Sequence, residues 1–170
     1  MELVRNKHFK EYLKNLYVKM MARHKSKTEA EALALFEDEY FNDLNMMIFV
    51  LESTFPNTKR VDDTYHFITK DDFIHTDIKT GKVYPCGALT FHIDANLIER
   101  LSFDNPWFHH GQIRTKKDGY LENEVGQVSC WGGFEHHGIG QMFCNIGLSG
   151  MLMDMYNFAR VSDHNTYMED

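Results

Sequence analysis

The apolar residues of this chain change their spacing once, near Pro56, and this change limits the fold more than any other feature. Before Pro56 they recur every three or four positions, and from Thr58 they alternate with polar residues in short segments rich in Val, Ile, Phe, Tyr and Thr. The first spacing is typical of amphipathic helices and the second of half-buried strands. We therefore expect a helical part at residues 1–54 and a sheet at residues 58–130.

Two helices are expected in the N-terminal part. The first runs from about Leu3 to Arg23, and the second follows Thr28, which forms a capping-box pattern with Glu31. The second helix should end before Pro56, because the residue that precedes a proline avoids the helical region. Its expected core-facing residues are Ala30, Leu33, Ala34, Phe41, Leu44, Ile48 and Leu51.

The remainder predicts an antiparallel meander of about four strands and one C-terminal helix. The expected strands are Val61–Ile68, Phe73–Ile78, Lys82–Ile93, and a fourth formed by Gln112–Thr115 with Gly126–Cys130. The helix should run over 139–160, where Gly140, Gly147 and Gly150 either permit close packing on the sheet or mark a break near Gly147. At 170 residues and 43% hydrophobic, the chain has enough apolar surface for one core. We therefore expect a single α+β domain over residues 1–170.

Charge divides the chain sharply. Residues 1–27 hold eight basic and two acidic side chains, a balance of +6, so the net charge of −7 leaves −13 for the other 143 residues. Residues 28–54 contain seven acids and no Lys or Arg. One interpretation is that the two helices are neighbours and partly neutralise each other. The alternative is a basic face that contacts phosphates or an acidic partner, although the acidic remainder argues against nucleic-acid binding.

The cysteine count and the hydropathy of the chain indicate the cellular compartment in which the protein is expected. The three cysteines, an odd number, match no disulfide framework and favour a reducing environment. The N-terminus has no uninterrupted apolar core of a signal peptide, and the longest apolar run, Met46–Leu51, is too short to cross a bilayer. These features predict a soluble, cytoplasmic protein.

The segment 107–144 gathers most of the side chains able to carry chemistry. It contains the pairs His109, His110 and His136, His137, together with Cys130 and Cys144. Cys130 follows a predicted strand and precedes a Gly-Gly loop and a helix, whose N-terminus would lower the pKa of its thiol. With a histidine alongside, such a thiolate has the parts of a covalent acyl-transfer site. The alternative is that Cys130 is a small buried residue.

Three passages in this region resemble prokaryotic and phage relatives of the ubiquitin-conjugating enzymes. They are Asn105–Ile113, Gly126–Gly132, and the end of the C-terminal helix with Asp163–Tyr167. The resemblance implies that Cys130 is the thioester cysteine, that His109 or His110 is the histidine of the His-Pro-Asn motif, and that the partner is a ubiquitin-like protein. Here no Pro-Asn follows either histidine, and Arg114–Val125 is inserted before the cysteine.

Two further hypotheses remain open. A metal site, with zinc as the cofactor, would use Cys130, His136, His137 and Cys144, although their spacing is wider than in structural zinc knuckles. Otherwise the protein has no cofactor. A non-catalytic, inhibitor-type module would bind a protein partner through the aromatic residues Trp107, Phe108 and Trp131.

Overall fold

The change from helices to strands occurs where the spacing of apolar residues predicts it. The computed structural model describes residues 2–92, 107–110, 114–115, 119–120 and 138–162. The helices are α1 (Glu2–Arg5), α2 (Lys7–Lys25), α3 (Glu29–Ser53) and α5 (Gly138–Arg160). The strands are β1 (Lys59–Val61), β2 (Thr64–Ile68), β3 (Phe73–Asp77), β4 (Val83–Gly87), β5 (Leu89–His92), β6 (Trp107–His110), β7 (Arg114–Thr115), β8 (Gly119–Tyr120) and β9 (Val161–Ser162).

The N-terminal helices follow their capping signals. Asn6 divides the first predicted helix into α1 and α2, because its side chain accepts a hydrogen bond from the His8 N–H at 2.8 Å and so starts a new helix. The capping box of α3 is confirmed: the Thr28 hydroxyl accepts from the Glu31 N–H, and the Glu31 carboxylate accepts from the Thr28 N–H, each at 3.1 Å. Helix α3 ends at Ser53, before Pro56, as expected.

Helix α3 buries a different face from the one predicted. Its buried residues are Ala32, Phe36, Met47, Val50 and Leu51. Of the predicted set, Leu51 is buried and Leu44 and Ile48 are half-buried, whereas Ala30, Leu33, Ala34 and Phe41 are exposed. The reason is that α3 packs against both α2 and α5, and this contact selects the side that carries Phe36 and Met47.

The strand pairing differs from the expected meander. Strand β2 pairs with β5 instead of β3, so the larger sheet has the order β1-β2-β5-β6, with all neighbours antiparallel. Strand β3 belongs to a second sheet of order β4-β3-β9, in which β9 is parallel to β3. The predicted strand 82–93 is therefore two strands, which meet at Ala88. Pro85 lies on β4, an edge strand where a residue without an N–H is tolerated, and the register of β4 against β3 shifts beside it, between Phe73 and Ile74.

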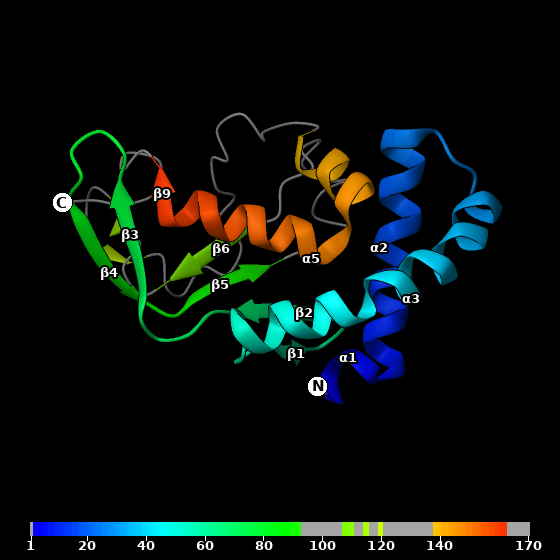
Figure 1. Cartoon of the computed structure of the whole chain (residues 1–170), viewed down its shortest axis with the longest axis horizontal. Helices are drawn as coiled ribbons and strands as arrows, with labels where there is room; N and C mark the ends of the chain where they lie inside the picture. Colours follow the sequence, from blue (N-terminus) through cyan, green and yellow to red (C-terminus); the bar gives the residue numbers. More distant parts are fainter. Residues whose placement is uncertain (1, 93–106, 111–113, 116–118, 121–137, 163–170) are drawn as a thin grey trace.

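The core lies between the helices and the two sheets (Figure 1). Aromatic rings connect the layers: Phe9 of α2 meets Tyr65 of β2 edge to face at 5.0 Å between ring centroids, and Tyr156 of α5 meets Phe73 of β3 at 5.5 Å. Helix α5 runs from its contact with α2 to its contact with β3 and β9. At that end the buried His75 donates from Nδ1 to the Ala159 carbonyl at 2.8 Å. No described helix is long and apolar enough to cross a membrane.

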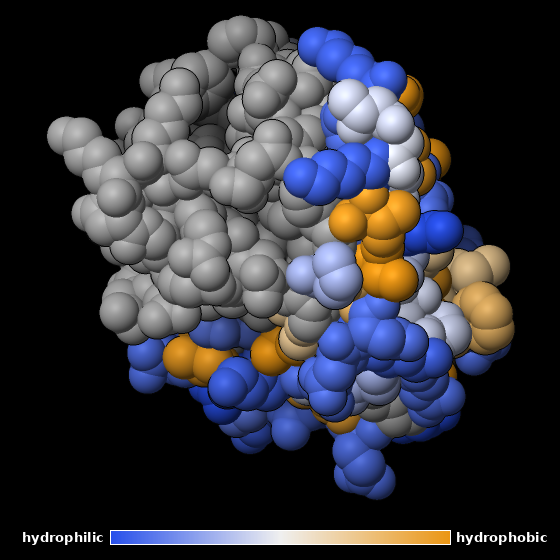
Figure 2. Space-filling model, turned by 90° about the vertical axis from the view of Figure 1, so that its left-hand side faces the viewer, coloured by the Kyte–Doolittle hydropathy of each residue, from blue (hydrophilic) through white to orange (hydrophobic). Residues whose placement is uncertain are grey.

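The smaller sheet has one buried and one exposed face. Phe73, His75 and Asp77 alternate along β3 and are buried toward α5, whereas Ile74 between them is exposed. Figure 2 views the end of the molecule that carries β3, β4 and β9, and it shows hydrophobic surface among hydrophilic side chains. The outer face of this sheet is therefore partly apolar.

The capping box generates the first prediction. Replacing Thr28→Ala removes the acceptor of the Glu31 N–H and should lower the free energy of unfolding by about 1 kcal/mol, measured by urea denaturation. Thr28→Ser keeps the hydroxyl and should retain most of the stability. Equal stability of Thr28→Ala and the wild type would contradict the role of this cap.

Candidate functional site

A cavity lies between α2, α3 and α5. Its volume is about 230 Å³. The polar residues that line it include Tyr17 of α2, Glu39, Asn42 and Asp43 of α3, and Cys144 and Asn145 of α5. Glu39, Asn42 and Asn145 are exposed, so the cavity opens to solvent.

Asp43 is the best-anchored polar group of this cavity. Its Oδ1 accepts a hydrogen bond from the Ser149 hydroxyl at 2.6 Å, and its carboxylate also accepts from the Ser149 N–H. Ser149 lies in the first turn after the break in α5, where backbone N–H groups have no partner within the helix. Asp43 therefore caps the second half of α5 from another helix.

Burial raises the pKa of the Asp43 carboxyl above its ordinary value of 3.8. The hydrogen bonds from Ser149 act in the opposite direction because they stabilise the charged form, and the negative charge of Glu39 adds to the increase. The folded state consequently holds a proton on Asp43 more tightly than the unfolded state does.

Gly147 allows this contact to form. Its φ of 74° and ψ of −178° interrupt α5, as the glycines of this segment predicted, and this combination of angles is essentially restricted to glycine. A Cβ at this position would lie 3.1 Å from Asp43 Oδ2. The glycine thus provides both the break in the helix and the space for the carboxylate.

Cys144, one of the predicted zinc ligands, lies on α5 before the break. It is half-buried, packs against the hydrophobic core and lines the cavity near Tyr17. Burial raises the pKa of the Tyr17 phenol, and the nearby Glu39 and Cys144 raise it further, so this phenol stays protonated at neutral pH. The described lining contains no His, Lys or Arg, so the cavity suits a hydrogen-bond donor or a cation better than an anion.

The predicted residues of β6 are placed by their backbone register. Trp107, Phe108, His109 and His110 pair with His92, Phe91, Thr90 and Leu89 of β5. Successive strand positions lie on opposite faces of a sheet, so the positions of His109 and His110 are on different faces. The row that contains Phe108 also contains Phe67 and Phe91, which are both buried.

The other predicted site residues lie outside the described part of the chain. These are Cys130, Trp131, His136 and His137. The thiol-transfer hypothesis, which needs Cys130 beside His109 or His110, stays a prediction, as does the zinc hypothesis. Within the described residues, no three His, Cys, Asp or Glu side chains are grouped so that they could share a metal ion.

An exposed line of α3 includes Phe41, which the sequence pattern had assigned to the core. Asp38, Phe41, Asn45, Phe49 and Glu52 recur every three or four positions and so form one line along the helix, here called the α3 stripe. Phe41 is 77% exposed and Phe49 is 65% exposed. Met46, which lies next to Phe49 on the surface of α3, is 56% exposed. Large apolar side chains are therefore displayed between two acids.

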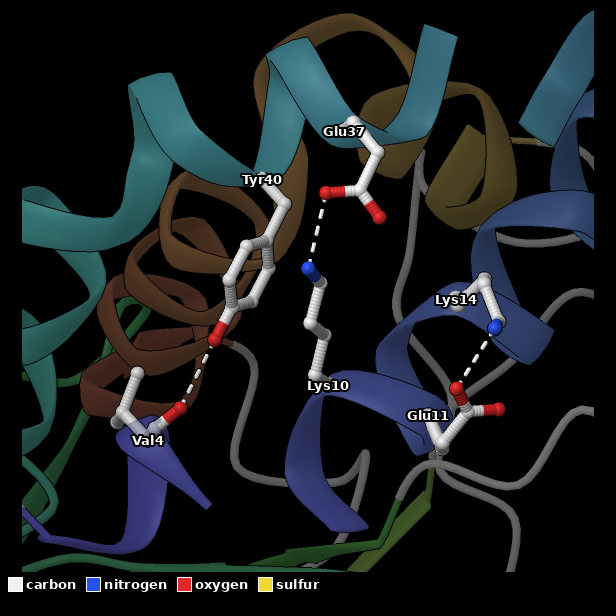
Figure 3. Close-up of polar contacts among 6 residues, drawn as sticks. All are labelled: Val4, Lys10, Glu11, Lys14, Glu37 and Tyr40. Atoms are coloured by element: carbon white, nitrogen blue, oxygen red, sulfur yellow. Dashed lines mark hydrogen bonds and ion pairs between the residues drawn. The ribbon is translucent and has the colours of Figure 1, made fainter. Parts of the chain in front are cut away.

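The side of α3 next to the stripe neutralises part of the basic N-terminus, as one interpretation of the charge pattern predicted (Figure 3). Lys10 of α2 forms an ion pair with Glu37 at 2.9 Å, and this partner raises the pKa of the Lys10 ammonium. The Lys10 ammonium also lies 5.2 Å from the ring centroid of Tyr40, whose hydroxyl donates to the Val4 carbonyl at 2.9 Å. Asp38 and Glu52 are not part of this contact with Lys10.

No protein-family model matches the chain, and neither a curated protein nor a solved structure matches it.

Sequence reasoning missed Asp43, Ser149 and the α3 stripe. A Gly-Leu-Ser sequence inside an apolar helical segment is the signal that could have indicated a new helix start at Ser149. The carboxylate that caps it comes from a residue 106 positions earlier, and a local pattern cannot identify such a partner.

The break at Gly147 generates the second prediction. Gly147→Ala should lower the free energy of unfolding by about 1–3 kcal/mol, because alanine strains this backbone conformation and its Cβ crowds Asp43. Gly81→Ala is the control, since Gly81 has a similar φ of 75° and nothing within 4 Å of an added Cβ. Urea denaturation should show the smaller loss for Gly81→Ala, and equal losses would argue against the Asp43 contact.

The raised pKa of Asp43 generates the third prediction. In the wild type, Asp43 contributes a stability that decreases as the pH rises from about 3.8 through the raised folded pKa, because the unfolded state loses its proton first. Asp43→Asn cannot ionise, so its stability relative to the wild type should increase over this interval. If the free energies of unfolding of the wild type and of Asp43→Asn, measured by urea denaturation, change in parallel with pH, the pKa of Asp43 is not raised. Asp43→Ala, which loses the cap, should be less stable by about 1 kcal/mol at neutral pH.

Proposed function

We propose that this protein is a protein-binding module whose α3 stripe, together with Met46, holds a partner surface that carries both apolar and basic side chains. The observation that carries this proposal is the exposure of Phe41 and Phe49 on a helix rich in acids and without Lys or Arg. The thiol-transfer function stays a prediction, because Cys130 lies outside the described residues.

Aromatic side chains favour this function energetically. Fully burying one phenyl ring contributes about 1.5–3 kcal/mol, and aromatic residues are enriched among those that dominate binding energy. Phe41 and Phe49 are two helical turns apart, about 12 Å along the axis. They could therefore fill two separate positions on a partner.

The acids determine the kind of partner. Asp38 and Glu52 lie at the two ends of the stripe, and both are exposed. Charges at the rim of an interface orient the partner and accelerate association more than they add affinity. A basic and apolar surface complements this arrangement, whereas an acidic surface would be repelled.

The scaffold of this module is proposed to be similar to that of the conjugating enzymes. In support, β1, β2, β5 and β6 pair antiparallel in chain order, with helices before them and α5 after them. The hairpin of β3 and β4, inserted between β2 and β5, departs from a simple four-stranded meander.

A peptide experiment tests the binding function and is the fourth prediction. A synthetic amphipathic helix with one leucine face and one lysine face should bind the full chain, and fluorescence anisotropy measures its affinity. The double variant Phe41→Ser with Phe49→Ser should weaken binding at least ~10-fold, as the loss of more than 1.4 kcal/mol of apolar contact requires. Its thermal stability should change little because both rings are exposed.

Controls separate the stripe from general attraction between charges. Leu33→Ser, which changes an exposed leucine on another side of α3, should bind the peptide as the wild type does. A peptide with glutamates in place of the lysines should bind more weakly. Unchanged binding by the double variant would reject the proposal.

A further inference from the structure

A second exposed apolar surface lies on the outer face of the sheet β4-β3-β9. Thr76 of β3 pairs with Val83 of β4 on one side and with Val161 of β9 on the other, so these three residues form one row across the sheet. Ile74 takes the alternate position beside Thr76 on β3, and Ile78 lies in the turn directly after the strand. The four apolar residues Ile74, Ile78, Val83 and Val161 are here called the β3 face.

All four side chains of the β3 face are substantially exposed, by 47% to 65%. This face is turned away from α5, because the intervening residues His75 and Asp77 are the buried ones. A contiguous apolar group on a sheet face is a typical protein-contact surface.

Cations border this face at the hairpin end. Lys79 and Lys82 lie in the turn between Ile78 and Val83, and both are exposed. The described acids Asp71 and Asp72 lie at the other end of β3. The β3 face therefore combines apolar and basic side chains, the combination that complements the α3 stripe.

Other pairs of surfaces would make a less favourable contact between two copies of the chain. Stripe against stripe would place the acids Asp38 and Glu52 of one copy against those of the other. Helices α1 and α2 are basic, but within their described residues they expose no large apolar side chain. The β3 face is the described surface that offers both properties.

We propose that the partner held by the α3 stripe is a second copy of this chain, which docks through its β3 face. This inference rests on the proposed function and specifies its partner. The two surfaces of the contact differ, so the association is head-to-tail: in a pair, one copy keeps its β3 face and the other keeps its stripe for a further copy. The patches are small, so the association should be weak and concentration-dependent.

Two single variants of the full chain test the contact, and this is the fifth prediction. Phe49→Asp disables the stripe and Ile78→Asp disables the β3 face; both replaced side chains are 65% exposed, so folding should be preserved, which circular dichroism checks. In sedimentation velocity from about 10 µM to about 1 mM, the wild type should show a mass that rises with concentration, whereas each variant alone should stay monomeric.

The mixture of the two variants gives the decisive result. Each contributes its one intact surface, so an equimolar mixture should form a species of twice the mass of one chain and no larger one. A mixture of Phe49→Asp with Phe41→Asp, which both lack the stripe, should remain monomeric. A monomeric Phe49→Asp and Ile78→Asp mixture, or a wild type that stays monomeric throughout, overturns the proposal.

Two further measurements separate the remaining outcomes. If the wild type is monomeric but still binds the leucine-lysine peptide through Phe41 and Phe49, the second-copy partner is wrong and the binding function stands. If peptide binding is also independent of these rings, both proposals fail. If a chain truncated after Ser162 self-associates and the full chain does not, residues 163–170 occupy the β3 face in the full chain. This result would overturn the inference.

Discussion

The arrangement of the helices depends on the break of α5 at Gly147. A straight helix could not follow both α2 and the second sheet, yet the first half of α5 meets α2, where Phe143 lies 6.3 Å from Tyr17, and the second half reaches β3 through Tyr156. Only glycine adopts this backbone conformation at low cost. The Asp43 carboxylate then satisfies the new helix start through Ser149. One backbone position and one half-buried acid thus connect three helices and a sheet.

The same contact explains why the surface of α3 differs from its sequence pattern. Asp43 must face α5 to cap it, and this orientation places Phe36, Met47 and Val50 in the core. Phe41 and Phe49 are then directed to solvent. On one helix an acid is half-buried and two phenyl rings are exposed, which is the reverse of what hydropathy favours. Such a reversal is more informative about function than exposed apolar residues that occur singly.

The pairing of the strands likewise decides which apolar face of a sheet is exposed. The hairpin of β3 and β4 leaves the main sheet, pairs with β9 at the end of α5, and so turns one apolar face outward. An alternation of apolar and polar residues indicates that a segment is a strand, but it does not indicate which other strand this segment pairs with. Both candidate binding surfaces, the α3 stripe and the β3 face, therefore result from long-range pairing.

The sequence by itself determined where helices and strands occur, because caps, turns and periodicity act over a few residues. The Thr28-Glu31 cap pattern, Pro56 and the glycines near 147 correspond to the observed boundaries of α3 and to the break in α5. The candidate site could be predicted only as a list of reactive residue types in 107–144, since their chemistry depends on distances. Which face of α3 is buried, which strands pair, and that Asp43 meets Ser149 were decided by tertiary structure alone. The physical reason is that these contacts join residues far apart in the chain, and their energies depend on packing that no local pattern contains.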